Sequence, residues 1–286
     1  MSAAIGKEVV EITKISLSEC ALGKLTEGKT FAKPMSEYDK PLGMVLEDLK
    51  FAEGLVKTDD NGKVYIDDKG NLIPDTDYIL NNNKYKTDEN GNTTKVDGEL
   101  AELEDDAAVR NNDAQRRAGG EDRKPNDHGG HIIARVLGGS GEMGNIIAMD
   151  SHINLSDYKN MEKEIISTLK ADKRVKFHAE ISYSDGSKRP DKIIIKTTID
   201  GKDTVYKFDN NIDGSLRDSL KETCNESDIA RVDRTCEKTG GEISSIKEEY
   251  DANGNLEKTT VTITSVNENG DNQRDKVTIN HQGGAE

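Results

Sequence analysis

One histidine, one asparagine and one glutamate have the types and spacing needed to hydrolyse a phosphate ester. His131 follows two glycines, Asn154 comes later in the chain, and Glu162 stands eight residues after Asn154. A neutral histidine can take a proton from an attacking water near pH 7. Mg²⁺ keeps several waters of its own, so one asparagine carbonyl can suffice as its direct ligand and a carboxylate can hold metal-bound water. This set indicates metal-dependent phosphodiester hydrolysis.

Two short apolar runs must position the histidine. The run 132–134 predicts a short buried strand beginning beside His131, and the run 145–149 predicts a second strand. The glycine-rich stretch 138–141 between them is typical of a turn, so the two runs favour a hairpin.

A helix must follow this hairpin. Asn154 or Ser156 can cap its start. Four apolar side chains recur at helical spacing and predict one buried face: Tyr158, Met161, Ile165 and Leu169. The local order is strand, strand, helix, with Asn154 and Glu162 on or beside the helix.

These residues carry a family resemblance. The run 129–164, GGHIIARVLGGSGEMGNIIAMDSHINLSDYKNMEKE, resembles the DNA/RNA non-specific endonuclease family, in its bacterial polymorphic-toxin branch. That family has a ββα-metal (His-Me finger) site. The matching motifs are Gly130-His131, Asn145-Ile146-Ile147-Ala148, Ile153-Asn154 and Met161-Glu162. Their order and the asparagine-to-glutamate spacing both fit the family pattern.

The resemblance implies roles for individual residues. His131 would be the general base, Asn154 the Mg²⁺ ligand with Mn²⁺ as a substitute, and Glu162 a water-mediated ligand. Asn145 would be a structural or active-site hydrogen-bonding residue. Three family positions differ, since Gly129 stands in place of an arginine, Met149 in place of a glutamine and Ile166 in place of a helix arginine.

Because the family arginines are absent at positions 129 and 166, other side chains must supply the positive charge that stabilises the transition state. Arg135 and Arg189 are the candidates for stabilising the transition state. Arg117 and Arg123, just upstream of the hairpin, are candidates for phosphate contacts. A solvated face with balancing acids explains the upstream arginines equally well.

Each of these residues has a commoner explanation when taken alone. A histidine after glycines is usually a turn or core residue, Asn154 a helix cap and Glu162 a solvated side chain. The four motifs in order reverse that weighting. His128 offers an alternative, because Asp127-His128 could mimic the start of an HNH motif that uses zinc or another transition metal.

Composition limits the class of protein. The chain has 286 residues, 33% hydrophobic and 33% charged, with no tryptophan, which indicates small cores. Net charge is −15, yet residues 110–200 hold 16 basic and 14 acidic side chains, so the acidity lies in the flanks. No apolar run approaches the roughly 20 residues of a transmembrane helix, and the N-terminus lacks a classical signal peptide's apolar core.

Three cysteines, Cys20, Cys224 and Cys236, lack metal-ligand spacing. Cys224 and Cys236 either pair in an oxidising compartment or remain free thiols. Asp209, Asn211, Asp213 and Gly214 match half of a calcium loop, but Leu220 occupies the position of its final glutamate, so a polar turn is favoured.

The predicted fold class is α+β, with a ββα-metal nuclease core, an antiparallel β-sheet and flanking β-hairpin-rich segments. Four segments are expected: 1–57 of unknown role, a hairpin-rich connector at 58–84, the endonuclease domain at 85–210, and a C-terminal helix plus β-hairpin extension at 211–286. Strands are predicted at 175–181, 193–197 and 205–208, and a C-terminal hairpin at 259–264 and 276–279.

The predicted function is metal-dependent, non-specific endonuclease action on DNA, with RNA as a second candidate substrate. The resemblance further implies an antibacterial toxin or effector, secreted or delivered into a target bacterial cell by a specialised secretion system, with a cognate immunity protein and no membrane partner. Two alternatives stay open: a non-catalytic β-rich binding or delivery protein with a degenerate nuclease core, and an HNH-type nuclease using His128.

Overall fold

The computed structural model describes residues 56–100, 111–184 and 186–281. They lie in one compact unit that extends from Ala52 to Glu286. The predicted N-terminal segment, up to residue 55, falls outside the described residues. Among the helices described, none has the length and apolar character that crossing a membrane requires.

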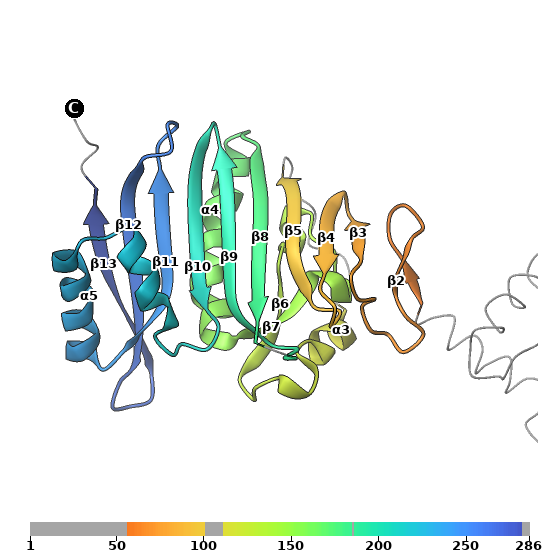
Figure 1. Cartoon of the computed structure of the whole chain (residues 1–286), viewed down its shortest axis with the longest axis horizontal. Coiled ribbons are helices and arrows are strands. Elements are labelled where there is room, and N and C mark those ends of the chain that lie inside the picture. Colours follow the sequence, from red (N-terminus) through yellow and green to blue (C-terminus); the bar gives the residue numbers. More distant parts are fainter. Residues whose placement is uncertain (1–55, 101–110, 185, 282–286) are drawn as a thin grey trace, which may run out of the picture. The chain divides into compact units, whose positions relative to one another are not determined.

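A nine-stranded sheet dominates the described structure (Figure 1). Every neighbouring pair of strands in it is antiparallel. In spatial order the strands are β13 (Asn272–Asn280), β12 (Leu256–Val266), β11 (Glu242–Tyr250), β10 (Lys202–Asp209), β9 (Pro190–Ile199), β8 (Val175–Tyr183), β5 (Thr93–Leu100), β4 (Asn83–Thr87) and β3 (Asp77–Leu80). This sheet confirms the predicted α+β class.

A short two-stranded sheet precedes it. β1 (Lys57–Thr58) pairs with β2 (Val64–Ile66), and the turn between them contains Gly62 at φ +79°. Of the segment expected to be a connector, 58–84, β3 instead belongs to the large sheet, where it pairs with β4.

The predicted strand–strand–helix unit is inserted between β5 and β8, the one place where neighbours in the sheet are not consecutive strands. It comprises α3 (Asn112–Arg117), η2 (Gly120–Asp122), β6 (Asp127–His131), η3 (Arg135–Leu137), η4 (Met143–Asn145), β7 (Ile146–Asp150), the π-helical turn η5 (Ile153–Asp157) and α4 (Tyr158–Lys170). The ββα order is therefore confirmed, and β6 pairs with β7 from Asp127↔Asp150 to His131↔Ile146.

The boundary of the first strand was predicted wrongly. β6 ends at His131 and does not begin there, while Ile132 and Ile133 are buried in the loop that follows. Apolar side chains signal burial, and a buried loop residue gives the same local signal as a buried strand residue.

The main core lies between α4 and one face of the sheet. All four predicted apolar residues of α4 are buried in it. Alternate residues of the central strands meet them, including Ala179 on β8, Ile195 on β9 and Tyr206 on β10, which are aligned by register. The strands predicted from this alternation are confirmed.

The C-terminal extension continues the same sheet and adds a second core on the opposite face. Its helices are η6 (Ser215–Glu222) and α5 (Glu226–Thr239). Phe208 of β10 belongs to the main core, whereas Ile246, paired with the adjacent Lys207, belongs to the second core with Leu216 and Val232. Successive strand residues face opposite sides, so α4 and α5 cover opposite faces of the sheet, as Figure 1 shows.

The predicted C-terminal hairpin is confirmed as β12 and β13. Cys224 and Cys236 pack beside the second core as free thiols, so they do not pair. Burial raises the pKa of both thiols.

Candidate active site

A buried ion pair fixes the base of the β6–β7 hairpin. Arg189 Nε lies 2.7 Å from Asp127 Oδ2, and Arg189 Nη2 donates to Asp127 Oδ1 at 2.9 Å. The side chain of Asp127 is 0% exposed and that of Arg189 is 4% exposed. Arg189 also donates to Asn211 Oδ1 and the Asn210 carbonyl. This geometry contradicts the prediction that Arg189 contacts substrate, because its donors are already used inside the protein.

Asn210 holds the other strand of the hairpin. Its amide Nδ2 donates to the Ala148 carbonyl at 3.0 Å, and its Oδ1 accepts the Asp150 N–H at 2.7 Å. The residue is fully buried just after β10. Sequence reasoning missed it, since it treated this stretch only as a calcium-loop fragment and a turn.

Asn145 is a structural residue. Its Oδ1 accepts bonds from the Ile133 N–H and the Tyr85 hydroxyl, and its Nδ2 donates to the carbonyls of Ile133 and Ser140. The residue is fully buried. Of the two roles that the family resemblance left open, the geometry supports the structural one: Asn145 shapes the loop that follows His131.

Glycine is needed at each of the two positions before His131, for a different reason at each. A Cβ on Gly129 would lie 2.4 Å from the Gln115 carbonyl oxygen, so α3 occupies the space that the family's arginine would need. A Cβ on Gly130 would lie 3.0 Å from Asn154 Oδ1. Glycine at position 130 therefore keeps the space beside that oxygen open.

Asn154 and Ser156 both lie inside a π-helical turn, so the prediction that one of them caps the helix is wrong. The turn runs from Ile153 to Asp157 and leads directly into α4. Such turns widen the helix and place side chains where a regular helix cannot, which is why they occur at functional sites. Periodicity alone does not distinguish this turn from a capped helix start.

One cavity of about 800 Å³ brings the proposed chemical groups together. His131 at the end of β6, Asn154 in the π-helical turn and Glu162 on α4 all line it. Arg135 also lines it. The lining also includes Arg116, Lys159 and Gln115.

The amide of Asn154 is oriented by His128. Asn154 Nδ2 lies 3.1 Å from His128 Nδ1. An amide nitrogen can only donate, so His128 Nδ1 accepts and its ring proton sits on Nε2. This contact directs Asn154 Oδ1 away from His128 and toward the open space beside Gly130.

The carboxyl group of Glu162 has a raised pKa. Burial raises the pKa of its carboxyl from 4.5 to about 7, and the nearby Lys159 charge opposes that shift. A bound cation would favour the ionised carboxylate.

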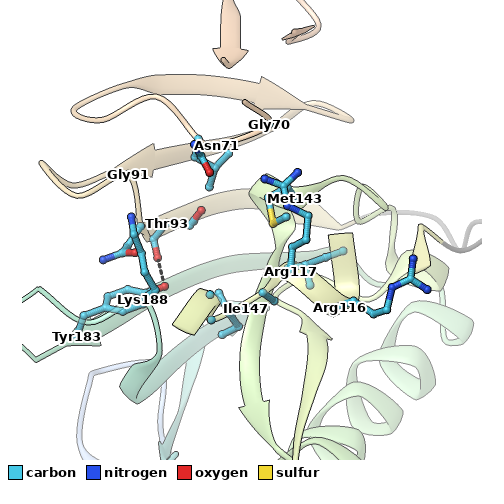
Figure 2. A pocket seen from close by; sticks show the side chains of 16 residues that line it. Gly70, Asn71, Gly91, Thr93, Arg116, Arg117, Met143, Ile147, Tyr183 and Lys188 are labelled. Carbon is cyan, nitrogen blue, oxygen red and sulfur yellow. Dashed lines mark hydrogen bonds between the residues drawn. The ribbon is translucent and has the colours of Figure 1, made fainter. Parts of the chain in front are cut away.

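Arg117 and Arg123, the two arginines predicted to contact phosphates, both use their guanidinium groups in hydrogen bonds to backbone carbonyls. Arg123 lines the cavity, but its guanidinium donates to backbone carbonyls, including those of Ala118 and Asp127. Arg117 lies outside this cavity and donates to the Lys69 carbonyl at 3.1 Å. It lines a separate pocket of about 340 Å³ with Lys188, and Figure 2 shows Arg116 and Arg117 pointing in different directions.

The donor set suits a hard divalent cation. Asn154 Oδ1 has open space kept by Gly130, and the Glu162 carboxylate faces the same cavity. Oxygen donors in small number match Mg²⁺, which retains several waters. Within the described ranges, no group of three or more His, Cys, Asp or Glu side chains gathers to hold a metal ion.

These features fit the active site of a nuclease, which hydrolyses phosphodiester bonds. Residues 74–201 match the family model of the DNA/RNA non-specific endonucleases. The match covers 128 of the 286 residues, and over this region the chain is similar to the DNA/RNA non-specific endonuclease family. The match begins earlier than the predicted domain start at residue 85 and includes β3.

Relatives with curated descriptions share this region. The chain is 37% identical over 132 residues to the type VII secretion system protein EssD of Staphylococcus aureus, in strains USA300 and NCTC 8325, and likewise in strain Newman. The alignment covers 44% of this chain and 21% of those proteins, so the chain spans about a fifth of their length.

A solved structure with weaker likeness is the crystal structure of NucA from Streptococcus agalactiae with no metal bound. It is 15% identical, with a TM-score of 0.36, over 57% of this chain and 86% of that one.

Proposed function

We propose that this protein hydrolyses phosphodiester bonds of DNA in a metal-dependent reaction without sequence preference, with RNA as a second candidate substrate. One observation carries the proposal: His131, Asn154 and Glu162 line a single cavity within the endonuclease domain. These residues come from a strand, a π-helical turn and a helix, so their convergence requires the tertiary fold.

His131 is the proposed general base. It lies at the cavity wall, where its imidazole can accept the proton of the water that attacks phosphorus. Asn154 Oδ1 would hold Mg²⁺ or Mn²⁺ directly, and Glu162 would hold it through water. When bound, the cation stabilises negative charge on the phosphate and the leaving oxygen.

The phosphate backbone of the nucleic acid is proposed to contact positively charged side chains at the cavity. Arg116 and Lys159 are both exposed, and both line the cavity. Arg135 lines it as well and keeps the role predicted for it in stabilising charge. Contacts of this kind are independent of base sequence.

We further propose an antibacterial toxin or effector role, with delivery by a specialised secretion system and a cognate immunity protein. The similarity to EssD, a type VII secretion system protein, supports this role. Mixed charge in the nuclease region and acidic flanks give an immunity protein surfaces of both signs to recognise.

The two alternatives are less well supported. A degenerate, non-catalytic core does not require His131, Asn154 and Glu162 to line one cavity. An HNH-type reaction with His128 as base conflicts with the use of His128 Nδ1 as an acceptor for Asn154.

Plasmid cleavage by the purified chain tests the proposal. Cleavage is expected with Mg²⁺ or Mn²⁺, and EDTA or His131→Ala is expected to abolish it. His178→Ala is the matched control, because His178 lies on β8, outside the cavity, and pairs with Asp97 at 2.6 Å. Intact plasmid and intact RNA with either metal would reject the catalytic proposal and favour the degenerate-core alternative.

A further inference from the structure

A buried hydrogen bond joins the π-helical turn to the C-terminal extension. Ser244 Oγ on β11 donates to Asp157 Oδ2 at 2.7 Å. Asp157 is the last residue of the turn that carries Asn154. Ser244 is fully buried and Asp157 is nearly so. The two residues are 87 positions apart, and Ser244 lies beyond the 74–201 family match.

A β-bulge presents Ser244 to the turn. The register between β11 and β12 shifts between Ile243 and Ser245, so Ser244 is the extra residue. A bulge bends the strand and re-aims the side chain. Thr264 Oγ1 donates to Ser244 Oγ at 3.0 Å, so the one Ser244 proton is available to donate, and Asp157 Oδ2 at 2.7 Å is a closer acceptor than the Thr262 carbonyl at 3.4 Å.

The second oxygen of Asp157 faces another strand of the extension. Arg274 Nε on β13 lies 3.8 Å from Asp157 Oδ1. Arg274 is partly exposed, whereas the Asp157 side chain is 6% exposed. The carboxylate is therefore held on one side by a buried hydroxyl and on the other by a positive charge.

The π-helical turn needs such support. A π turn lacks the regular hydrogen bonding that stabilises an α-helix by itself, and it persists where surrounding contacts favour it. Asn154 stands three residues before Asp157 in this turn, so a shift of the turn moves Asn154 Oδ1 relative to Gly130.

We propose that the C-terminal extension positions Asn154 for metal binding through Ser244 and Asp157. Both are positioning residues, since they act through Asn154 and line no part of the cavity. The inference rests on the proposed function where it concerns the metal. Anchoring of the turn itself is independent of catalysis.

Ser244→Ala in the full chain tests the proposal against a matched control, Lys247→Gln. Lys247 also links β11 to α4, through a 2.8 Å contact with Glu164 Oε2, but it does so ten residues past Asn154. The control therefore removes a contact between the extension and the helix without touching the turn.

Two readouts do not depend on cleavage. Amide hydrogen exchange in residues 152–158 is expected to accelerate about tenfold in Ser244→Ala, and the dissociation constant for Mn²⁺ without substrate is expected to rise about tenfold. A hydrogen bond to a charged group is large enough for an effect of this size. Lys247→Gln is expected to leave both values within about twofold.

Cleavage kinetics add a third readout. At limiting Mg²⁺, kcat is expected to fall about tenfold in Ser244→Ala with KM for DNA within about twofold, and excess Mg²⁺ is expected to restore kcat. A general loss of stability does not produce this pattern.

Equal exchange rates and Mn²⁺ affinities in the two variants would overturn the proposal. If Ser244→Ala does not fold, Arg274→Gln replaces it, with about threefold changes expected in the same directions and wild-type values rejecting the idea. A wild-type chain that binds no Mn²⁺ would instead overturn the proposed function and the metal role together. The exchange rates would then decide whether the extension anchors the turn.

Discussion

Asn154 and His128 face each other in the wall of the cavity of about 800 Å³, with Asn154 Nδ2 3.1 Å from His128 Nδ1. Through this contact, His128 orients the side chain of Asn154, the proposed metal ligand. We therefore expect His128 and His131 to have separable roles.

The histidine variants are expected to behave differently. His131→Ala should reduce cleavage by about 10²–10⁴-fold while Mn²⁺ affinity stays within about twofold, because a general base is lost and no ligand is removed. His128→Ala should weaken Mn²⁺ binding by about fivefold, the effect of one neutral hydrogen bond, with cleavage restored at high Mg²⁺. Metal titration calorimetry and plasmid cleavage measure both. Loss of cleavage at saturating metal in His128→Ala alone would favour the HNH-type alternative.

The raised pKa of Glu162 predicts that the metal-free protein loses stability as pH rises. Burial holds this pKa at about 7 against an ordinary 4.5. Below 4.5 both folded and unfolded chains hold the proton, and between 4.5 and 7 only the folded chain does. The free energy of unfolding should therefore fall by about 3 kcal/mol in total as pH passes upward through 7.

Urea unfolding in EDTA at pH 5 and pH 8 measures that slope, and Glu162→Gln should flatten it. Saturating Mg²⁺ should stabilise the protein more at pH 8 than at pH 5, since the metal favours the carboxylate. Equal slopes in wild type and Glu162→Gln would show that Glu162 ionises as an ordinary carboxylate.

Loss of the Arg189–Asp127 ion pair should destabilise the fold strongly. Arg189→Met leaves the Asp127 carboxylate buried without its partner, which costs about 3–5 kcal/mol. Arg174→Met is the control, because the exposed Arg174–Glu99 pair at 2.7 Å should contribute less than about 1 kcal/mol. Urea denaturation of both variants measures the difference. Equal small losses would show that the buried pair does not contribute the stability expected of it.

The positively charged side chains that line the cavity should set the salt dependence of DNA binding. Arg116→Gln and Lys159→Gln, each in a His131→Ala background, should lower the slope of log Kd against log salt by about 0.9 if each contacts one phosphate. Arg234→Gln, an exposed position on α5, should leave the slope unchanged. Fluorescence anisotropy with duplex DNA at several salt concentrations gives these slopes. An unchanged slope in both cavity variants would place the DNA elsewhere.

The sequence alone determined the parts of the site that depend on local order. His131, Asn154 and Glu162 were predicted from residue type and spacing together with the family resemblance, and the cavity brings all three together. The apolar face of α4 and the central strands followed from periodicity, because a side chain's place on a helix or strand is fixed by its position in the repeat. The ββα order followed from the same signals.

Only the tertiary structure decided the roles of the arginines. An arginine bears the same charge in a buried ion pair as on a binding surface, and its partner decides between them. The partner of Arg189 lies 62 residues away, at Asp127. Arg116 and Arg117 are neighbours in sequence, yet only Arg116 lines the main cavity.

The tertiary structure also decided that the C-terminal strands join the large sheet and reach the π-helical turn. Local patterns predict strands but not their neighbours, because sheet pairing joins residues distant in sequence and is selected by the burial of whole faces. The 87-residue separation of Ser244 and Asp157 leaves no local signal. Their contact exists only because β11 pairs with β10, which places the bulge against the π-helical turn.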